Sequence, residues 1–355
     1  MNLKIFIIFS ILSYVYSYKI GIVGPTGAVG KEIINCLYSE LGVKNSKLTD
    51  IKLFSSKRSA GKFIDTPFGK RKVELFDVKE ARKCDVNFLA VSGDFSKKYA
   101  KALSYGHDGS IVIDNSSAFR YDDDVPLVIP EINGNKIKNK KLISNPNCTT
   151  AIALIALYPI LLKYGIKKLI MSTYQASSGA GYKGMEELDL GIKDYVTKNT
   201  YPTYNHVFSH PLPFNVIPHI DEFLKDGETK EEWKMVVETK KILDPKIEVF
   251  ATCVRVPVFI GHGESINIET EKPINFKTAV NILKKSRGIA VVDTRKDGGY
   301  ISPDESAGED DVFVSRIRKD KSVKNGLALW VAADNLRKGA ALNSVQIAEE
   351  LIKIL

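Results

Sequence analysis

Two residues that can carry out covalent catalysis stand in distinctive surroundings in this sequence. Cys148 follows Asn147 and directly precedes an apolar segment that predicts a helix over residues 149–163. The free N–H groups and partial positive charge of a helix N-terminus lower the pKa of a thiol. We therefore expect Cys148 to form a nucleophilic thiolate, the alternative being an inert core cysteine.

A nucleophilic thiol needs a partner that accepts and returns protons, and His262 is the histidine best suited to that task. Glycines on both sides of His262 indicate a loop where substrate and backbone come close. The other histidines, His107, His206, His210 and His219, lie in polar or proline-rich stretches. His262 is thus the predicted general acid/base, the alternative being a structural histidine.

A glycine-rich turn near the N-terminus indicates a dinucleotide site. It follows a strand pattern at residues 18–23 and precedes a helical pattern, an arrangement that presents backbone N–H groups to a pyrophosphate. The spacing is Gly-x-x-Gly-x-x-Gly, with Pro25 inside the turn, and an ordinary tight turn is the alternative. The predicted cofactor-binding residues here are Gly24, Thr26, Gly27, Ala28, Val29 and Gly30.

The end of the next predicted strand, residues 51–54, distinguishes NAD from NADP. An NAD enzyme usually carries an acidic side chain there, whereas this chain has Ser55, Ser56 and Arg58. Hydroxyl groups and a guanidinium suit a 2′-phosphate, because arginine can donate two parallel hydrogen bonds to it. We predict NADP as the cofactor; a polar turn without a ligand is the alternative.

These residues have to be positioned by a fold with two parts. Strand patterns at 18–23, 51–54, 86–91 and 110–113 alternate with helical segments, which predicts an α/β domain with a doubly wound parallel sheet of Rossmann type. This alternation is lost after residue 146, where longer strands are predicted at 168–174, 247–257, 264–270, 312–318 and 327–333. A second, α+β domain with a mixed sheet is expected there. An amphipathic helix at 336–355 can pack back onto the first domain.

The first seventeen residues differ from the rest of the chain. A basic start at Lys4, a short apolar run and small or branched residues near a possible cleavage site are typical of a signal peptide. The run is too short and interrupted to favour a membrane span. Import through the secretory route or into an organelle such as a plastid is expected, with a mis-set start codon or an uncleaved extension as alternatives. The predicted domains are a leader at 1–17, an NADP-binding domain at 18–146 completed by 334–355, and a catalytic and dimerisation domain at 147–333.

The composition is that of a globular protein and excludes several functional classes. The chain has 355 residues, 44% of them hydrophobic, which is enough for a large core. Its net charge of +9 comes from scattered basic residues without interleaved aromatics, which argues against a nucleic-acid partner and suits anionic substrates. The four cysteines form no Cys-x-x-Cys pair, so we predict neither a metal site nor a disulfide scaffold.

The motifs together resemble the aspartate-semialdehyde dehydrogenase family, from residue 18 to the C-terminus. Besides the glycine turn and the Cys148 loop, the matching segments are 116–120, 174–181, 231–234, 255–263 and 333–340. They occur in the order of the family, and the spacing of seven positions between Arg255 and His262 is specific. The resemblance implies a homodimer or homotetramer in the cytoplasm or a plastid. The hydrophobic leader is not typical of the family.

The resemblance also implies the reaction. Cys148 would attack the aspartyl carbonyl, His262 would move the proton, and Gln175 would hold the substrate near the thiol. The implied activity is the reversible, NADP-dependent reduction of aspartyl phosphate to aspartate semialdehyde through a cysteine thioester. This step belongs to the aspartate pathway to lysine, threonine, methionine and isoleucine.

Further residues would hold the substrate and the cofactor by the same resemblance. The implied substrate-binding residues are Arg120 and Lys234 for phosphate, with Asn115 nearby, Arg255 for the α-carboxylate, Glu231 for the amino group and Asn147 for the reacting carbonyl. Ser178, Gly179 and Asn335 would complete the cofactor site. Without the resemblance these are ordinary surface residues, strand ends or, for Glu231 and Lys234, a helical ion pair.

Three rival functions are compatible with part of the sequence. The related N-acetylglutamyl-phosphate reductases share the acyl-phosphate chemistry, but the segments around Glu231 and Arg255 fit them less well. A cysteine hydrolase that uses Cys148 and His262 leaves the glycine turn unexplained. An exported binding protein without activity would not need Cys148, His262 and Arg255 together.

Overall fold

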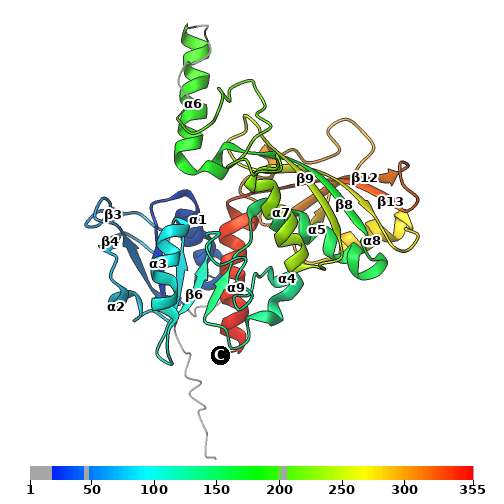
Figure 1. The fold of residues 1–355 in the computed structure, drawn as a ribbon. Helices are drawn as coiled ribbons and strands as arrows, with labels where there is room; N and C mark the ends of the chain where they lie inside the picture. Colours follow the sequence, from blue (N-terminus) through cyan, green and yellow to red (C-terminus); the bar gives the residue numbers. More distant parts are fainter. Residues whose placement is uncertain (1–17, 44–47, 199, 201–205, 355) are drawn as a thin grey trace, which may run out of the picture.

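The computed structural model describes residues 18–43, 48–198, 200 and 206–354 (Figure 1). The predicted leader at residues 1–17 lies outside them. The described residues form a seven-stranded and a six-stranded sheet, each with its own hydrophobic core. No helix in this part of the chain has the length and apolar character that a bilayer crossing requires.

The first sheet is parallel, except at one edge. Its strands, in the order β3-β4-β2-β1-β5-β6-β7, are Phe63–Ile64, Arg71–Leu75, Leu48–Ser55, Tyr18–Val23, Val86–Leu89, Ile111–Asp114 and Leu142–Ser144. Only the β3–β4 pair is antiparallel. The central strand β1 is buried at all positions but one, because helices cover both faces of the sheet.

The helices of this half lie on both faces of the sheet. They are α1 (Ala28–Leu37), continued by a π-helical turn η1 (Tyr38–Val43), α2 (Val78–Ala81), α3 (Gly93–Ser104), α4 (Pro130–Asn133) and the 3₁₀ turn η2 (Gly134–Ile137). The C-terminal helix α9 (Leu342–Ile354) shares one hydrophobic cluster with α1 and β1, whereas α3 packs on the opposite face. The C-terminal helix α9 thus packs on the first sheet (Figure 1).

The second sheet is mixed. Its strands, in the order β11-β12-β13-β10-β8-β9, are Ile289–Val291, Val312–Asp320, Gly326–Ala333, His262–Glu269, Lys168–Gln175 and Glu248–Arg255. The β8–β9 and β11–β12 pairs are parallel and the other three are antiparallel. The helices around it are α5 (Cys148–Tyr164), α6 (Gly181–Lys198), α7 (Lys230–Ile242) and α8 (Phe276–Lys285), with short turns η3 (Ser177–Ala180), η4 (Asp304–Ser306) and η5 (Arg337–Ala341).

One face of the second sheet is covered and the other is open. The helix α5 is apolar around nearly its whole circumference and packs on β10, β12 and β13, with α7 beside it on β9 and α8 beside it on β11 and β12. On the opposite face Ile170, Tyr174 and Phe250 are exposed. The helix α6 projects away from the body of the protein in Figure 1.

The structure confirms the predicted fold class, an α/β domain with a parallel sheet followed by a domain with a mixed sheet. Four short strands, β3, β4, β7 and β11, fall outside the predicted pattern. They have two to five residues each, too few for an alternation of apolar and polar residues to become visible.

Candidate active site

The candidate nucleophile lies at the start of a helix, where the sequence places it. Cys148 is the first residue of α5, and the Asn147 side chain caps the helix by accepting hydrogen bonds from the N–H groups of Thr149 (3.1 Å) and Thr150 (3.3 Å). The Asn147 amide nitrogen donates to Glu231 at 2.9 Å. The oxygen and the nitrogen of the Asn147 side chain are thus both hydrogen-bonded, and these bonds hold the loop that carries the thiol.

The thiol of Cys148, at the start of α5, lies next to the imidazole of His262, at the start of β10. The Sγ atom of Cys148 lies 3.4 Å from Nε2 of His262, which is the first residue of β10 and is fully buried. The backbone N–H of Ala176 donates to Nδ1 of His262 at 3.0 Å, which orients the ring. The pair is within reach for direct proton transfer.

Burial, rather than the helix N-terminus, dominates the charge state of this pair. Burial and the nearby Glu231 carboxylate raise the pKa of Cys148 to about 12, although Arg255 and the Thr149 N–H act in the opposite direction. Burial and Arg255 lower the pKa of His262 to about 3. The expected lowering of the thiol pKa is therefore wrong for the protein alone, because loss of hydration outweighs the helix end. These shifts favour the neutral thiol of Cys148 and the neutral imidazole of His262.

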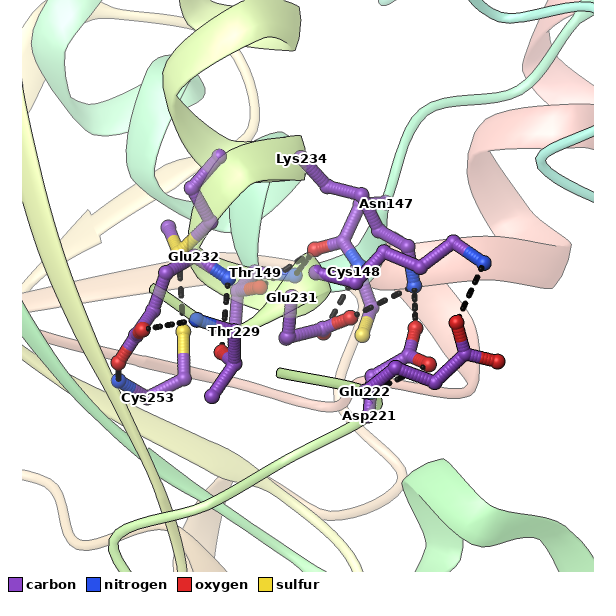
Figure 2. A network of polar contacts seen from close by, with 12 residues as sticks. Asn147, Cys148, Thr149, Asp221, Glu222, Thr229, Glu231, Glu232, Lys234 and Cys253 are labelled. Atoms are coloured by element: carbon purple, nitrogen blue, oxygen red, sulfur yellow. Dashed lines mark hydrogen bonds and ion pairs between the residues drawn. The ribbon is translucent and has the colours of Figure 1, made fainter. Parts of the chain in front are cut away.

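A network of buried polar groups surrounds the thiol, with Glu231 at its centre (Figure 2). Glu231 accepts hydrogen bonds from Asn147 and from Gln175 (3.2 Å), and Lys234 pairs with it at 3.0 Å. Burial opposes the ionisation of Glu231, but Lys234 and these hydrogen bonds prevail and lower its pKa to about 2. Lys234 also pairs with Asp221 at 2.6 Å. The site thus holds a permanent carboxylate beside the thiol.

The start of α7 is fastened so that Glu231 faces inward. Thr229 and Glu232 form a capping box, in which Thr229 accepts from the Glu232 N–H and Glu232 accepts from the Thr229 N–H. The second oxygen of Glu232 accepts the N–H of Cys253 on β9 at 3.0 Å (Figure 2). The helix therefore begins at a fixed point above the sheet.

The buried carboxylate of Glu238, which the sequence did not reveal, holds Arg120, the arginine predicted to bind phosphate. Glu238 on α7 has no exposed surface and pairs with Arg120 at 3.1 Å, and its other oxygen accepts the N–H of Asn147 at 2.7 Å. Arg120 also donates to the backbone carbonyl of Asn115 at 3.0 Å. The positions 231, 234 and 238 share one helical face, and that spacing is the signal that could have identified Glu238.

The arginine predicted to bind the α-carboxylate of the substrate is hydrogen-bonded to the main chain. Arg255, the last residue of β9, donates to the carbonyl of Ala176 at 2.7 Å and is buried. A Cβ atom at Gly179 would lie 2.8 Å from Nη1 of Arg255, so a side chain at this position would have to displace the guanidinium. Ser178 donates to Asn335 at 3.0 Å, and the Gly261 N–H also bonds to Asn335, so these predicted cofactor residues form one cluster.

The glycine turn between β1 and α1 has a backbone that a bulkier sequence could not adopt. Gly24 has a φ angle of +90°, and a Cβ atom at Gly30 would lie 2.1 Å from the Gly24 carbonyl oxygen. Gly27 precedes α1 without a side-chain cap. The open N-terminus of α1 and the absence of side chains at these glycines fit a pyrophosphate group.

The neighbouring strand end carries the residues predicted to select NADP. Ser55 ends β2 next to β1, and the Gly24 N–H donates to the carbonyl of Phe54 at 2.9 Å, so the two segments are adjacent. Ser56, Lys57 and Arg58 are exposed, and among the described residues neither Lys57 nor Arg58 has an ion-pair partner. The guanidinium is therefore available to an anionic ligand.

A cavity of about 740 Å³ joins the two regions. The predicted site residues that line it are Val29, Arg120, Asn147, Cys148, Gln175, Ser178, Gly179, Glu231, Lys234, Arg255 and Asn335. His262 lies behind Cys148 and does not line it, and neither does the rest of the glycine turn nor the Ser55–Arg58 segment. The lining residues outside the prediction include His219 and Gly339. Within the described ranges no group of His, Cys, Asp or Glu side chains has the arrangement of a metal site.

Comparison with known domains defines the class of this protein. The sequence model of the semialdehyde dehydrogenase NAD-binding domain matches residues 19–140, and that of the semialdehyde dehydrogenase dimerisation domain matches residues 157–338. Both matches coincide with the two sheets. The class is thus a semialdehyde dehydrogenase with a nucleotide-binding domain and a dimerisation domain.

Comparison with individual proteins and solved structures identifies the family within this class. The chain is 45% identical to the aspartate-semialdehyde dehydrogenase of Aquifex aeolicus over 95% of this chain and 98% of the relative. The crystal structure of aspartate semialdehyde dehydrogenase II from Vibrio cholerae complexed with ASA has a TM-score of 0.88 and 39% identity, covering 95% of this chain and 98% of the other. The Candida albicans enzyme with NADP has a TM-score of 0.73 and 25% identity, covering 94% and 98%. The chain belongs to the aspartate-semialdehyde dehydrogenase family, as its motifs predict.

Proposed function

We propose that this protein catalyses the reversible, NADP- and phosphate-dependent interconversion of aspartate semialdehyde and aspartyl phosphate through a thioester on Cys148. The observation that carries the proposal is the 3.4 Å contact between Sγ of Cys148 and Nε2 of His262, beside a cavity that also contains Arg120, Lys234 and Arg255. A thiol, a proton carrier and three cations are the groups that acyl transfer to phosphate requires.

The neutral state of both catalytic groups defines the first step. The raised pKa of Cys148 favours its thiol form, so its proton has to leave as the sulfur bonds to the aldehyde carbon. Because Nδ1 of His262 accepts the Ala176 N–H, its Nε2 carries a proton; His262 donates this proton to the carbonyl oxygen, which becomes the hydroxyl group of a thiohemiacetal, and takes up the thiol proton in its place. Oxidation of the carbon, with His262 taking the hydroxyl proton, leaves the acyl group on Cys148 as a thioester. When bound, NADP supplies the hydride chemistry.

Phosphate completes the oxidative direction. A phosphate oxygen attacks the thioester carbon, the carbon–sulfur bond breaks, and its electron pair returns to Cys148, which takes back a proton from His262. Arg120 and Lys234 would bind the phosphate, and Arg255 the α-carboxylate of the substrate. Glu231, ionised because Lys234 and two amides stabilise it, would receive the amino group of the substrate. Without substrate, Lys234 is paired with Glu231 and Asp221, which fix its position. Phosphate would therefore bind a lysine that also keeps these two carboxylates as partners.

We propose NADP rather than NAD because of the residues at the carboxyl end of β2. Ser55, Ser56 and Arg58 stand where a 2′-phosphate would lie beside the glycine turn, and the Candida albicans relative is described with NADP. Ser178, Gly179 and Asn335 would contact the nicotinamide end, because they line the cavity next to Cys148. We further propose the corresponding division of labour, with residues 18–146 and 334–355 binding NADP and residues 147–333 carrying the chemistry.

The open face of the second sheet supports a homodimer. Ile170, Tyr174 and Phe250 expose 41%, 36% and 55% of their surfaces on a sheet face opposite to the described helices α5, α7 and α8. The matched dimerisation model spans these strands. Contact between two copies would cover the apolar face.

The decisive assay measures NADP reduction by the purified protein with aspartate semialdehyde. We expect reduction only when phosphate or arsenate is present, and loss of activity by at least about 10³-fold in Cys148→Ser. Cys253→Ala is the matched control, because Cys253 is buried against Met235 and lines no part of the cavity. Turnover without phosphate, or an active Cys148→Ser variant, contradicts the proposal.

A second substrate distinguishes the nearest rival. The same assay with N-acetylglutamate semialdehyde should give little activity, because Glu231 is positioned for a charged amino group and an acetylated nitrogen has none. A preference for the acetylated substrate would assign the chain to the reductase instead.

A further inference from the structure

One backbone segment touches the nucleophile although no catalytic role accounts for it. Gly339 lies in the π-helical turn η5 and lines the cavity. A Cβ atom at this position would lie 2.9 Å from the Cβ atom and 3.3 Å from the Cα atom of Cys148. Gly339 is not among the glycines with a positive φ angle, so its backbone accepts alanine. The contact with Cys148 is therefore what excludes a side chain there.

The preceding residue is a buried cation that faces a different partner. Lys338 is only 1% exposed, and its Nζ atom donates to both carboxylate oxygens of Glu131 in α4, at 2.8 and 2.9 Å. Gln346 of α9 also accepts from it. Because removing one partner would leave an uncompensated buried charge, η5 has to keep Lys338 beside Glu131.

The position of η5 connects the two halves of the protein. It packs against α1, which follows the glycine turn, against α5, which begins at Cys148, and against α9. Just before it, the Asp334 side chain accepts the N–H groups of Leu336 (2.7 Å) and Arg337 (3.1 Å). The turn is thus held at its start by Asp334 and in its middle by the Lys338–Glu131 pair.

We propose that Lys338, Glu131 and Gly339 are positioning residues for the nucleophile: the buried ion pair holds the glycine turn against the backbone of Cys148, which keeps the sulfur facing His262. The pair lies outside the cavity, so it acts through Gly339 and touches no reacting atom. The inference rests on the proposed role of Cys148. A π-helical turn at this point agrees with the frequent occurrence of such turns at functional sites.

The steric part is tested with Gly339→Ala. The added methyl group has to displace Cys148, so we expect kcat to fall at least about 50-fold while the Kd of NADP changes less than threefold. The second-order rate of Cys148 alkylation by iodoacetamide, assigned by peptide mass spectrometry, should change at least fivefold. Gly93→Ala is the control, because a Cβ atom at Gly93 meets nothing within 4 Å and its φ angle is not positive. An unchanged kcat and alkylation rate in Gly339→Ala would overturn the proposal.

The ion pair is tested by separating its effect on stability from its effect on the thiol. Lys338→Met and Glu131→Gln each leave one buried group without its partner, so these single variants are expected to lose both stability and activity. The double variant Lys338→Met/Glu131→Leu leaves no unpaired charge and should regain most of its melting temperature. We expect its kcat to stay at least tenfold low and its Cys148 alkylation rate to stay altered. If kcat and alkylation return together with stability, the pair is merely structural and the proposal fails.

Alkylation of Cys148 does not depend on turnover, which separates this inference from the proposed function. An active Cys148→Ser variant would remove the proposed function directly. Normal alkylation in Gly339→Ala, with Cys148→Ser inactive, would remove only the positioning role.

Discussion

The nucleotide turn and the thiol site are built by different means, although one cavity links them. The turn is a single run of chain, residues 24–30, whose shape depends on backbone angles and on the absence of side chains at Gly24 and Gly30. The thiol site is assembled from β8, β9, β10, α5, α7 and η5, and its order depends on buried charges. A local site tolerates change around it, whereas a site of interlocking buried charges does not.

The comparison predicts that changes in the thiol region affect turnover and leave nucleotide affinity intact. The largest such effect is expected for His262→Gln, which keeps a polar side chain but cannot transfer protons. We expect kcat to fall by about 10²–10⁴-fold, the usual contribution of general acid–base catalysis. Steady-state kinetics and a fluorescence titration with NADPH measure the two quantities. A loss of less than tenfold would show that His262 is not the proton carrier.

A smaller loss is expected when the buried partner of Arg120 is neutralised. Glu238→Gln retains the shape but leaves the buried Arg120 without its carboxylate at 3.1 Å. We expect kcat/KM for phosphate to fall by about 10–100-fold and the melting temperature to drop, because an uncompensated buried charge is strongly destabilising. An unaltered KM for phosphate would separate Arg120 from phosphate binding.

The nucleotide region should show the opposite behaviour. Arg58→Ala removes an exposed guanidinium, so we expect the Kd of NADPH to rise about tenfold, as for one charge-assisted hydrogen bond. The kcat at saturating NADPH and the affinity for NADH should change less than twofold. Isothermal titration with both nucleotides provides the comparison, and an equal loss for both would contradict 2′-phosphate recognition by Arg58.

The smallest effect concerns a buried acid next to His262 in β10. Glu264 is fully buried, its carboxyl oxygens have no hydrogen-bond partner among the described residues, and burial raises its pKa well above 4.5. The folded protein thus retains a proton that the unfolded chain releases, so this contribution to stability is complete below about pH 4.5 and is lost as the pH rises through the raised pKa. Glu264→Gln cannot ionise.

We therefore expect the melting temperature of Glu264→Gln to exceed that of the natural protein at pH 8 by a few degrees, roughly 2–4 °C. The difference should shrink towards pH 5. Calorimetric melting curves between pH 5 and 8 measure it. A constant difference across this range would show that Glu264 is ionised in the folded state.

The same comparison explains which parts of the protein are predictable from the sequence. The glycine turn, the strand before it and the helix after it are contiguous, so their pattern suffices to predict them. The Cys148 loop is equally local, but the charge state of the thiol is not. The pKa of the thiol depends on burial and on the charges of residues more than eighty positions away in the sequence, such as Glu231 and Arg255. The role of Glu238 and the contact of Gly339 with Cys148 likewise arise only when distant elements pack together.

The central claim is that Cys148 carries the acyl group, and trapping that group tests it most directly. The protein is mixed with aspartate semialdehyde and NADP⁺ without phosphate, quenched in acid and analysed by intact-protein and peptide mass spectrometry. We predict one aspartyl group per chain, attached to the peptide that contains Cys148 and released when phosphate is added before the quench. An unmodified Cys148 under these conditions, or an adduct that persists in Cys148→Ser, would contradict the account.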